Sequence, residues 1–217
     1  MEAFSDGVIA ILITVMVLEL HVPHGTTWSA LHGSTSQLLT YVLSFVYLGI
    51  YWNNHHHMLM LTRRVDGLVL WANLHLLFWL SLIPFTTGWM GENHFPKIPV
   101  AVYGIVLLAS GIAYLGLQTA IIRTQEERTL ADAVGRDTKG KLSPILYVAG
   151  ITLAFVNRWI AVTLYVVVAL MWLIPDRRVE RTIAAHEHVE DQEHRARDQQ
   201  RHAAAEHRQH DQLPLDG

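Results

Sequence analysis

The chain contains no cysteine among its 217 residues, and only 16% of its residues are charged. The lack of cysteine excludes a disulfide framework and a thiolate metal site. No nucleophile elbow, phosphate-binding loop or catalytic carboxylate pair is present, so no motif indicates an enzyme. The formal net charge is −3 and the basic residues form no stripe, which argues against a nucleic-acid partner.

Apolar residues make up 51% of the chain and are concentrated in residues 1–176. Residues 177–217 are almost entirely polar and include six of the 14 histidines. This division predicts a polytopic membrane domain at 1–176 and a His-rich cytoplasmic tail at 177–217, helical at its start and then disordered. A His-rich tract also binds metals weakly, but a solvated tail is the simpler interpretation, and no metal site is predicted.

Six apolar stretches approach the length of about 20 residues that crosses a hydrocarbon core of about 30 Å. They predict an all-α membrane protein with six transmembrane helices, at about 4–20, 36–61, 67 to 84 or 89, 98–122, 143–156 and 159–175. The first stretch has no basic residues before it and no small-residue cleavage site, so it is interpreted as a retained helix rather than a signal peptide. No internal repeat is visible.

The positions of the basic residues predict the orientation. With the N-terminus inside, 14 of the 16 Lys and Arg residues lie on the cytoplasmic side, and only Lys97 and Arg158 lie outside. Both termini are therefore expected in the cytoplasm.

The first apolar helix carries a narrow stripe of branched side chains with a single hydroxyl. On one helical face, at spacing i, i+3, i+4 and i+7, it presents Ile11, Thr14, Val15 and Leu18. In a single chain such a stripe packs against other helices or contacts lipid. In a ring of several copies it forms a hydrophobic constriction, which blocks ions by dewetting. Composition leaves both interpretations open, and the chain has no TVGYG filter.

Polar side chains gather at the predicted inner ends of the first three helices. They are Ser5, Asp6, Asn53, Asn54, His55, His56, His57, Asn73 and His75. An ionisable group at the edge of a membrane span is costly and is usually functional. We expect Ser5 and Asp6 to hydrogen-bond to the His and Asn groups and so fix the first helix. A helix N-cap with an acid favoured by the macrodipole is a compatible alternative for Ser5 and Asp6.

The three successive histidines do not form a metal site on one helix, because neighbouring side chains point about 100° apart. A site across helices from Asp6, His57 and His75 is the remaining arrangement. Hydrogen bonding and packing explain these imidazoles more simply.

Several separated motifs resemble one family. Phe4-Ser5-Asp6, followed by Ala10-Ile11, Thr14 and Val17-Leu18-Glu19-Leu20, is similar to the F-S-D signature of the transmembrane protein 175 family, which comprises lysosomal and prokaryotic potassium channels. Further matches are Trp52-x-x-His55-His56, and Asn73 with Pro84-Phe85. The signature of the family also has an arginine four residues before the phenylalanine, at a position that here precedes Met1.

The resemblance implies a six-helix protomer that assembles as a homotetramer in prokaryotes, with the first helices lining a central pore. It places the constriction at Ile11, Val15 and Leu18 and a hydroxyl layer at Thr14, and Val15 in place of a more usual leucine widens one ring. It assigns the helix-fixing role to the F-S-D residues, so the expected polar network comprises Phe4, Ser5, Asp6, Trp52, His55, His56, Asn73 and His75.

The predicted function is that of a potassium-permeable cation channel in a prokaryotic plasma membrane, with K⁺ as the permeant ion and no cofactor. Its expected partners are other copies of the chain, the lipid bilayer and monovalent cations. A secondary transporter or proton-coupled permease that uses Asp6 and the histidines is the main alternative, although transporters commonly contain internal repeats. A membrane metalloenzyme built on the histidines is a third.

Overall fold

The computed structural model describes residues 1–60, 62, 64–124 and 138–173, and this part of the chain contains helices joined by loops and no strand. The helices are α1 (Glu2–Leu18), α2 (Trp28–Gly33), α3 (Thr35–Met60), α4 (Gly67–Ser81), α5 (Ile83–Glu92), α6 (Lys97–Thr124), α8 (Thr138–Ala154) and α9 (Arg158–Leu173). The predicted all-α class is confirmed. The tail predicted at 177–217 lies outside the described residues.

Each of the six predicted stretches overlaps a helix, and the third overlaps two. Within the described residues, two helical stretches are long and apolar enough to cross a membrane. They are Gly67–Glu92 and Lys97–Thr124, with mean hydropathies of 1.8 and 2.1. Arg158–Leu173 is a shorter apolar helix. The short helix α2, which the sequence did not predict, begins where the Thr27 hydroxyl accepts a hydrogen bond from the backbone N–H of Ala30 over 3.3 Å.

A proline explains why the third stretch contains two helices. Pro84 lies in the first turn of α5, where its missing N–H matters least, but inside a continuous helix the ring would clash with the carbonyl four residues earlier. The chain therefore ends α4 at Ser81 and starts α5 at Ile83. At its other end α4 is capped by Asp66, whose carboxylate accepts a hydrogen bond from the N–H of Val69 over 2.8 Å.

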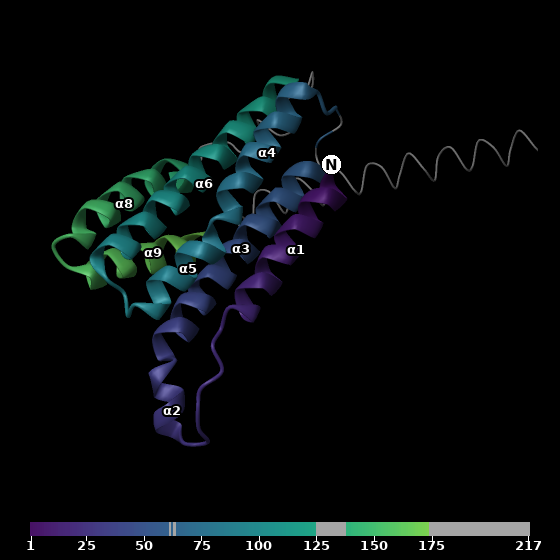
Figure 1. Ribbon diagram of the computed structural model, residues 1–217. Helices are drawn as coiled ribbons and strands as arrows, with labels where there is room; N and C mark the ends of the chain where they lie inside the picture. The colour runs from purple at the N-terminus through teal and green to yellow at the C-terminus, as the bar shows by residue number, and fades with distance from the viewer. Residues whose placement is uncertain (61, 63, 125–137, 174–217) are drawn as a thin grey trace, which may run out of the picture. The chain divides into compact units, whose positions relative to one another are not determined.

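Helices α3 and α6 form the middle of the bundle. Helix α3 packs against α1, α5 and α9, and α6 packs against α4, α5, α8 and α9. Figure 1 shows α1 along one side of the bundle and α8 on the other. Helix α1 contacts α3, α4 and α5, so its neighbours cover only one of its faces.

Buried hydroxyl groups join the central helices. Ser44 lies within 2.6 Å of the Thr87 hydroxyl and within 3.0 Å of the Tyr103 hydroxyl, which links α3, α5 and α6. The Tyr47 hydroxyl donates to the carbonyl of Tyr165 on α9 over 2.6 Å. Because buried polar groups without partners are costly, these bonds fix the rotation of each helix about its axis.

Candidate functional site

Helix α1 leaves one apolar face uncovered by the rest of the chain. The exposed fractions of Phe4, Ile11 and Leu18 are 58%, 60% and 81%, and these residues recur every seven positions. Gly7 and Thr14 fall between them and are also exposed. An apolar stripe at alternating spacings of three and four residues is typical of a helix that packs against copies of itself.

The residues predicted to form a constriction lie on or beside this face. Ile11, Thr14 and Leu18 are exposed, and Val15 is half-buried at its edge. The Thr14 hydroxyl donates to the carbonyl of Ile11 over 2.8 Å. Its proton is therefore used within the helix, and the oxygen lone pairs remain available on the exposed face.

The opposite face of α1 is packed and carries a buried serine. Ile9 and Met16 are almost completely buried, and each contributes about 1.5–3 kcal/mol by removal of its side chain from water. Ser5 is fully buried on the same side and donates from its hydroxyl to the carbonyl of Met1 over 3.2 Å.

A chain of three buried side chains ties α1 to α3 and α4. The amide nitrogen of Asn73 donates to the Ser5 hydroxyl over 2.9 Å. The amide oxygen of Asn73 lies 2.7 Å from Nε2 of His55, and because this oxygen only accepts, Nε2 carries the proton and donates. Each of the three residues is at most 2% exposed. The network therefore fixes both the depth and the rotation of the first turn of α1.

A second group of polar side chains lies beside this network and is partly open to solvent. Nδ1 of His56 lies 3.2 Å from a carboxylate oxygen of Glu2 and 3.7 Å from one of Asp6. The Trp52 ring stacks on the His56 ring, with centroids 5.8 Å apart and an interplanar angle of 24°. When His56 is protonated, both carboxylates attract it and hold α1 against α3.

Within the described part of the chain, one group of side chains lies close enough together to hold a metal ion, and it consists of Glu2, Asp6 and His56. The ligand atoms of Glu2, Asp6 and His56 lie within 4.8 Å of one another. Two of the three are acids, and their side chains are 45% and 30% exposed. Such groups are common without a metal, and ion pairing with His56 accounts for this arrangement.

The structure brings together six of the eight residues expected in the polar network. They are Ser5, Asp6, Trp52, His55, His56 and Asn73. Phe4 and His75 lie elsewhere. Phe4 is on the exposed face of α1, and His75 is exposed on α4, where Nε2 accepts a hydrogen bond from the Trp79 indole over 2.9 Å. Asp6, His57 and His75 do not form the cross-helix group weighed for a metal.

Sequence reasoning missed Glu2 as a member of this site. Glu2 lies one helical turn before Asp6, at the i, i+4 spacing that places two side chains on the same face. That spacing was a sufficient signal once Asp6 had been singled out.

Comparison with known proteins places these features in a family. Residues 1–84 match the family model described as endosomal/lysosomal potassium channel TMEM175. A protein named as a potassium channel in Chryseobacterium sp. (strain P1-3) is 52% identical over 184 residues, which cover 84% of this chain and 96% of the relative. The chain belongs to the TMEM175 family.

Other TMEM175 relatives agree in sequence and in fold. A potassium channel of Chamaesiphon minutus is 30% identical over 189 residues, 80% of this chain and 92% of the relative. The crystal structure of a lysosomal potassium-selective channel TMEM175 homologue from Chamaesiphon minutus superposes with a TM-score of 0.70 at 30% identity, over 79% of this chain and 93% of that one. The bundle described above is therefore a TMEM175 channel fold.

Proposed function

We propose that the protein is a potassium-permeable channel in which α1 from four copies of the chain lines a central pore. The potassium permeability rests on membership of the TMEM175 family and on relatives that are named potassium channels. A channel of this family is not an enzyme and needs no cofactor, and K⁺ is the permeant ion.

The uncovered apolar face of α1 is the observation that carries the pore assignment. Three of the four predicted pore residues, Ile11, Thr14 and Leu18, are exposed in the single chain. If copies of α1 surround one axis, these side chains form stacked rings. A narrow ring of Ile or Leu excludes water, and a cation crosses it only after losing part of its hydration shell. Potassium loses that water more readily than sodium, so such a neck favours potassium.

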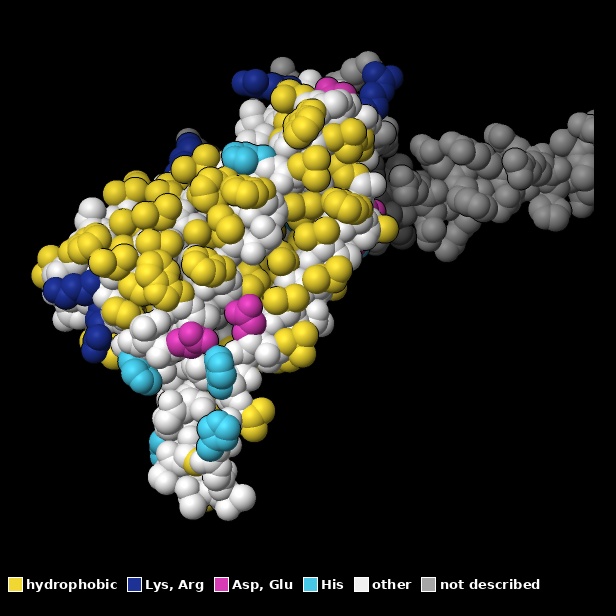
Figure 2. Space-filling view, in the orientation of Figure 1, with side chains coloured by type: hydrophobic (Ala, Val, Ile, Leu, Met, Phe, Trp, Pro, Cys, Tyr) yellow, Lys and Arg dark blue, Asp and Glu magenta, His cyan; other side chains and the backbone are white. Residues whose placement is uncertain are grey.

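The membrane placement follows from the distribution of side chains over the bundle. Figure 2 shows a broad band of apolar side chains over the visible face, with Lys and Arg side chains at both ends and most of the visible His side chains at the lower end. We propose that the six predicted helical stretches cross the plasma membrane of a prokaryote with both termini in the cytoplasm. Residues 1–176 then form the channel domain, and residues 177–217 form a cytoplasmic tail.

The buried network gives the pore helix a fixed position at its cytoplasmic end. The hydrogen bonds from Asn73 hold Ser5 against α4 and α3, and His56 lies close to Asp6. A helix that is fixed in rotation presents the same residues to the pore in every copy. The polar residues therefore support conduction indirectly, through the position of α1.

Crosslinking tests the pore assignment directly, because the chain has no cysteine and each engineered thiol is the sole thiol in its chain. Leu18→Cys is expected to give disulfide-linked dimers in membranes under mild oxidation. Ile145→Cys is the matched control, since Ile145 is 65% exposed on α8 at the opposite side of the bundle. Absence of Leu18→Cys dimers, or equal yields at both positions, would show that α1 does not meet its copies.

Potassium flux into liposomes tests conduction. Ile11→Ala widens the proposed constriction and is expected to raise the potassium flux. Leu18→Asn makes its ring of side chains polar, which admits water, and is also expected to raise the flux. Ile145→Ala removes a comparable side chain outside the neck and should leave the flux unchanged. Single-channel currents separate this proposal from a transporter that uses Asp6 and the histidines, because unitary currents exceed the turnover of alternating access.

A further inference from the structure

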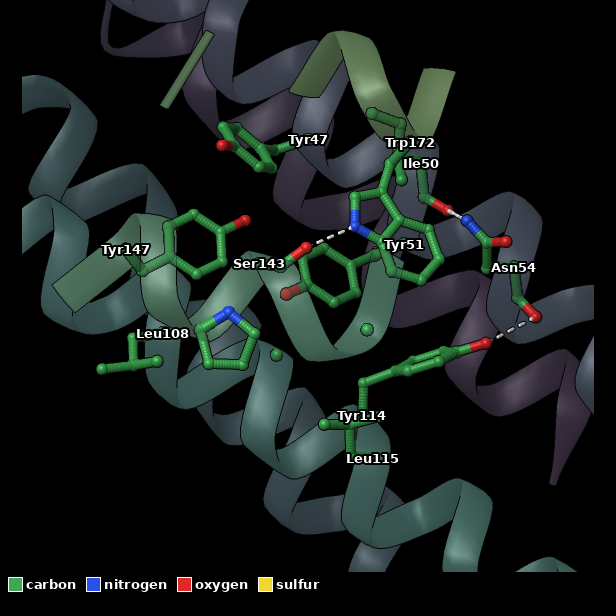
Figure 3. Close-up of a pocket in the computed structure, with 13 residues that line it drawn as sticks. Tyr47, Ile50, Tyr51, Asn54, Leu108, Tyr114, Leu115, Ser143, Tyr147 and Trp172 are labelled. Atoms are coloured by element: carbon green, nitrogen blue, oxygen red, sulfur yellow. Dashed lines mark hydrogen bonds between the residues drawn. The ribbon is translucent and has the colours of Figure 1, made fainter. Parts of the chain in front are cut away.

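A pocket of about 50 Å³ lies between α3, α6, α8 and α9 and is separate from the pore helix. Figure 3 shows the residues that line it, and none of them belongs to α1. The residues that line the pocket include no Asp, Glu, Lys, Arg or His. The volume of the pocket is well below the range of about 300–1,000 Å³ that is typical of pockets for drug-sized ligands, so the pocket suits only a small ligand.

Five of the thirteen residues that line the pocket are aromatic. Tyr51 and Tyr114 lie edge to face with ring centroids 6.2 Å apart. The Trp172 indole donates to the Ser143 hydroxyl over 2.8 Å, and that hydroxyl donates to the carbonyl of Lys139 over 2.8 Å. Hydrogen bonds therefore hold the indole in one orientation, and a ligand that stacks on it meets a wall that is already formed.

One of the residues that line the pocket is a glycine on α6, Gly111. A Cβ atom built on Gly111 would lie 3.8 Å from the Tyr51 hydroxyl and 3.9 Å from the Tyr147 ring, which is ordinary van der Waals contact. Space in front of Gly111 is therefore unfilled. Larger side chains at this position would occupy the hollow.

Two polar groups at the wall have hydrogen-bonding capacity left over. The Tyr51 side chain is 9% exposed, and its hydroxyl makes no hydrogen bond to any described residue. Asn54 donates from its amide nitrogen to the carbonyl of Ile50 over 2.8 Å, which leaves its amide oxygen as an acceptor. Either group can accept a hydrogen bond from a ligand hydroxyl.

We propose that this pocket binds small, uncharged aromatic molecules of the phenol class. The lining without charged side chains favours a neutral ligand, because an ion would lose its hydration without gaining a partner. The tyrosine and tryptophan rings favour an aromatic body. The leftover oxygen atoms favour a single hydroxyl, which donates to Asn54 or Tyr51.

The probe is 4-bromophenol, whose bromine quenches tryptophan fluorescence at contact. When 4-bromophenol is titrated into the purified full chain, we expect it to quench part of the tryptophan fluorescence in a saturable manner. The Trp172→Phe variant should lack this saturable quenching. Quenching in the wild type that rises linearly without saturation would overturn the proposal. Because the readout is binding, the result does not depend on whether α1 forms a pore.

Two leucine substitutions on the same helix test the location. Gly111→Leu fills the hollow and is expected to weaken binding at least tenfold. Gly116→Leu is the matched control, since a side chain there meets nothing within 4 Å, and it should bind as the wild type does. Equal affinities for the two variants would place the binding elsewhere. Gly111→Ala, which fits without displacement, provides a milder version if the leucine variant does not fold.

The hydroxyl requirement is tested by a ligand pair and one variant. Bromobenzene, which lacks only the hydroxyl, is expected to bind about fivefold more weakly than 4-bromophenol, in line with the loss of one hydrogen bond. Tyr51→Phe should reduce the difference between the two ligands. Equal binding of both ligands to the wild type would overturn the phenol assignment and indicate a purely apolar occupant such as a lipid acyl chain.

Discussion

The amide nitrogen of Asn73 lies 2.9 Å from the hydroxyl of Ser5, and this bond joins α4 to the helix that we assign to the pore. Asn73 also accepts from His55 on α3, so one amide group connects three helices. Its loss leaves Nε2 of the buried His55 without a partner and removes one of the two hydrogen bonds of the Ser5 hydroxyl.

Asn73→Ala is expected to lower the free energy of unfolding by about 1–3 kcal/mol, because the buried Nε2 of His55 loses its partner. Thermal unfolding of the purified protein in detergent measures the effect. Asn93→Ala is the control, since this exposed amide bonds only to the Trp89 carbonyl of its own helix. Equal melting temperatures for the two variants would mean that the buried network does not stabilise the bundle.

Asp6→Ala is expected to reduce potassium flux, because His56 loses one of the two carboxylates that hold α1 against α3. A double-mutant cycle with His56→Ala should give a coupling of about 0.2–1 kcal/mol, as measured for partly exposed ion pairs. Glu19→Ala removes an exposed acid just beyond the other end of α1 and serves as the control. Unchanged flux in Asp6→Ala, or zero coupling, contradicts an anchoring role.

Thr14→Val replaces the exposed hydroxyl of α1 with a methyl group of similar size. The Thr14 proton is already donated to Ile11, so the oxygen is free to face a partly dehydrated cation. We expect the permeability ratio of potassium to sodium to fall, while unfolding changes by no more than about 0.5 kcal/mol. Reversal potentials under bi-ionic conditions measure the ratio. Thr152→Val, an exposed threonine on α8 with the same kind of backbone bond, should leave the ratio unaltered.

Gly150→Ala is expected to destabilise the protein by about 1–3 kcal/mol, the usual range for overpacking a core. A Cβ atom at Gly150 would overlap the ring of Tyr165, which is fully buried. Gly116→Ala, on an open part of α6, should instead raise stability by about 0.5–1 kcal/mol through its better helix propensity. Denaturant midpoints for the two variants should therefore move in opposite directions.

The sequence predicted the apolar helical segments, apart from the division between α4 and α5, and which polar groups meet at one depth, but it did not predict the short helix α2. Hydropathy and helix-breaking residues such as Pro84 indicated where the helices begin and end. The predicted membrane topology placed Ser5, His55 and Asn73 at the same depth, and the structure joins them by hydrogen bonds. These features depend on local composition and on the order of the spans, which a single sequence contains.

The rotation of each helix was harder to predict. Helix α4 is apolar on nearly every side, so no amphipathic pattern indicates whether Asn73 or His75 faces the bundle. Packing against α1 and α6, together with the hydrogen bond to His55, decides that Asn73 is buried and His75 is exposed. The pocket beside Gly111 was missed for the same reason, because its wall comes from four helices that are distant in sequence.

Phe4, Ile11 and Leu18 are spaced seven residues apart, and this spacing also constrains the angle at which neighbouring α1 helices cross. Seven residues of a straight α-helix fall about 20° short of two full turns, so the three side chains drift around the cylinder. Copies standing upright about an axis would aim only one of these positions straight inward. For all three to point inward, the helices must lean across one another with the left-handed supercoil of a coiled coil.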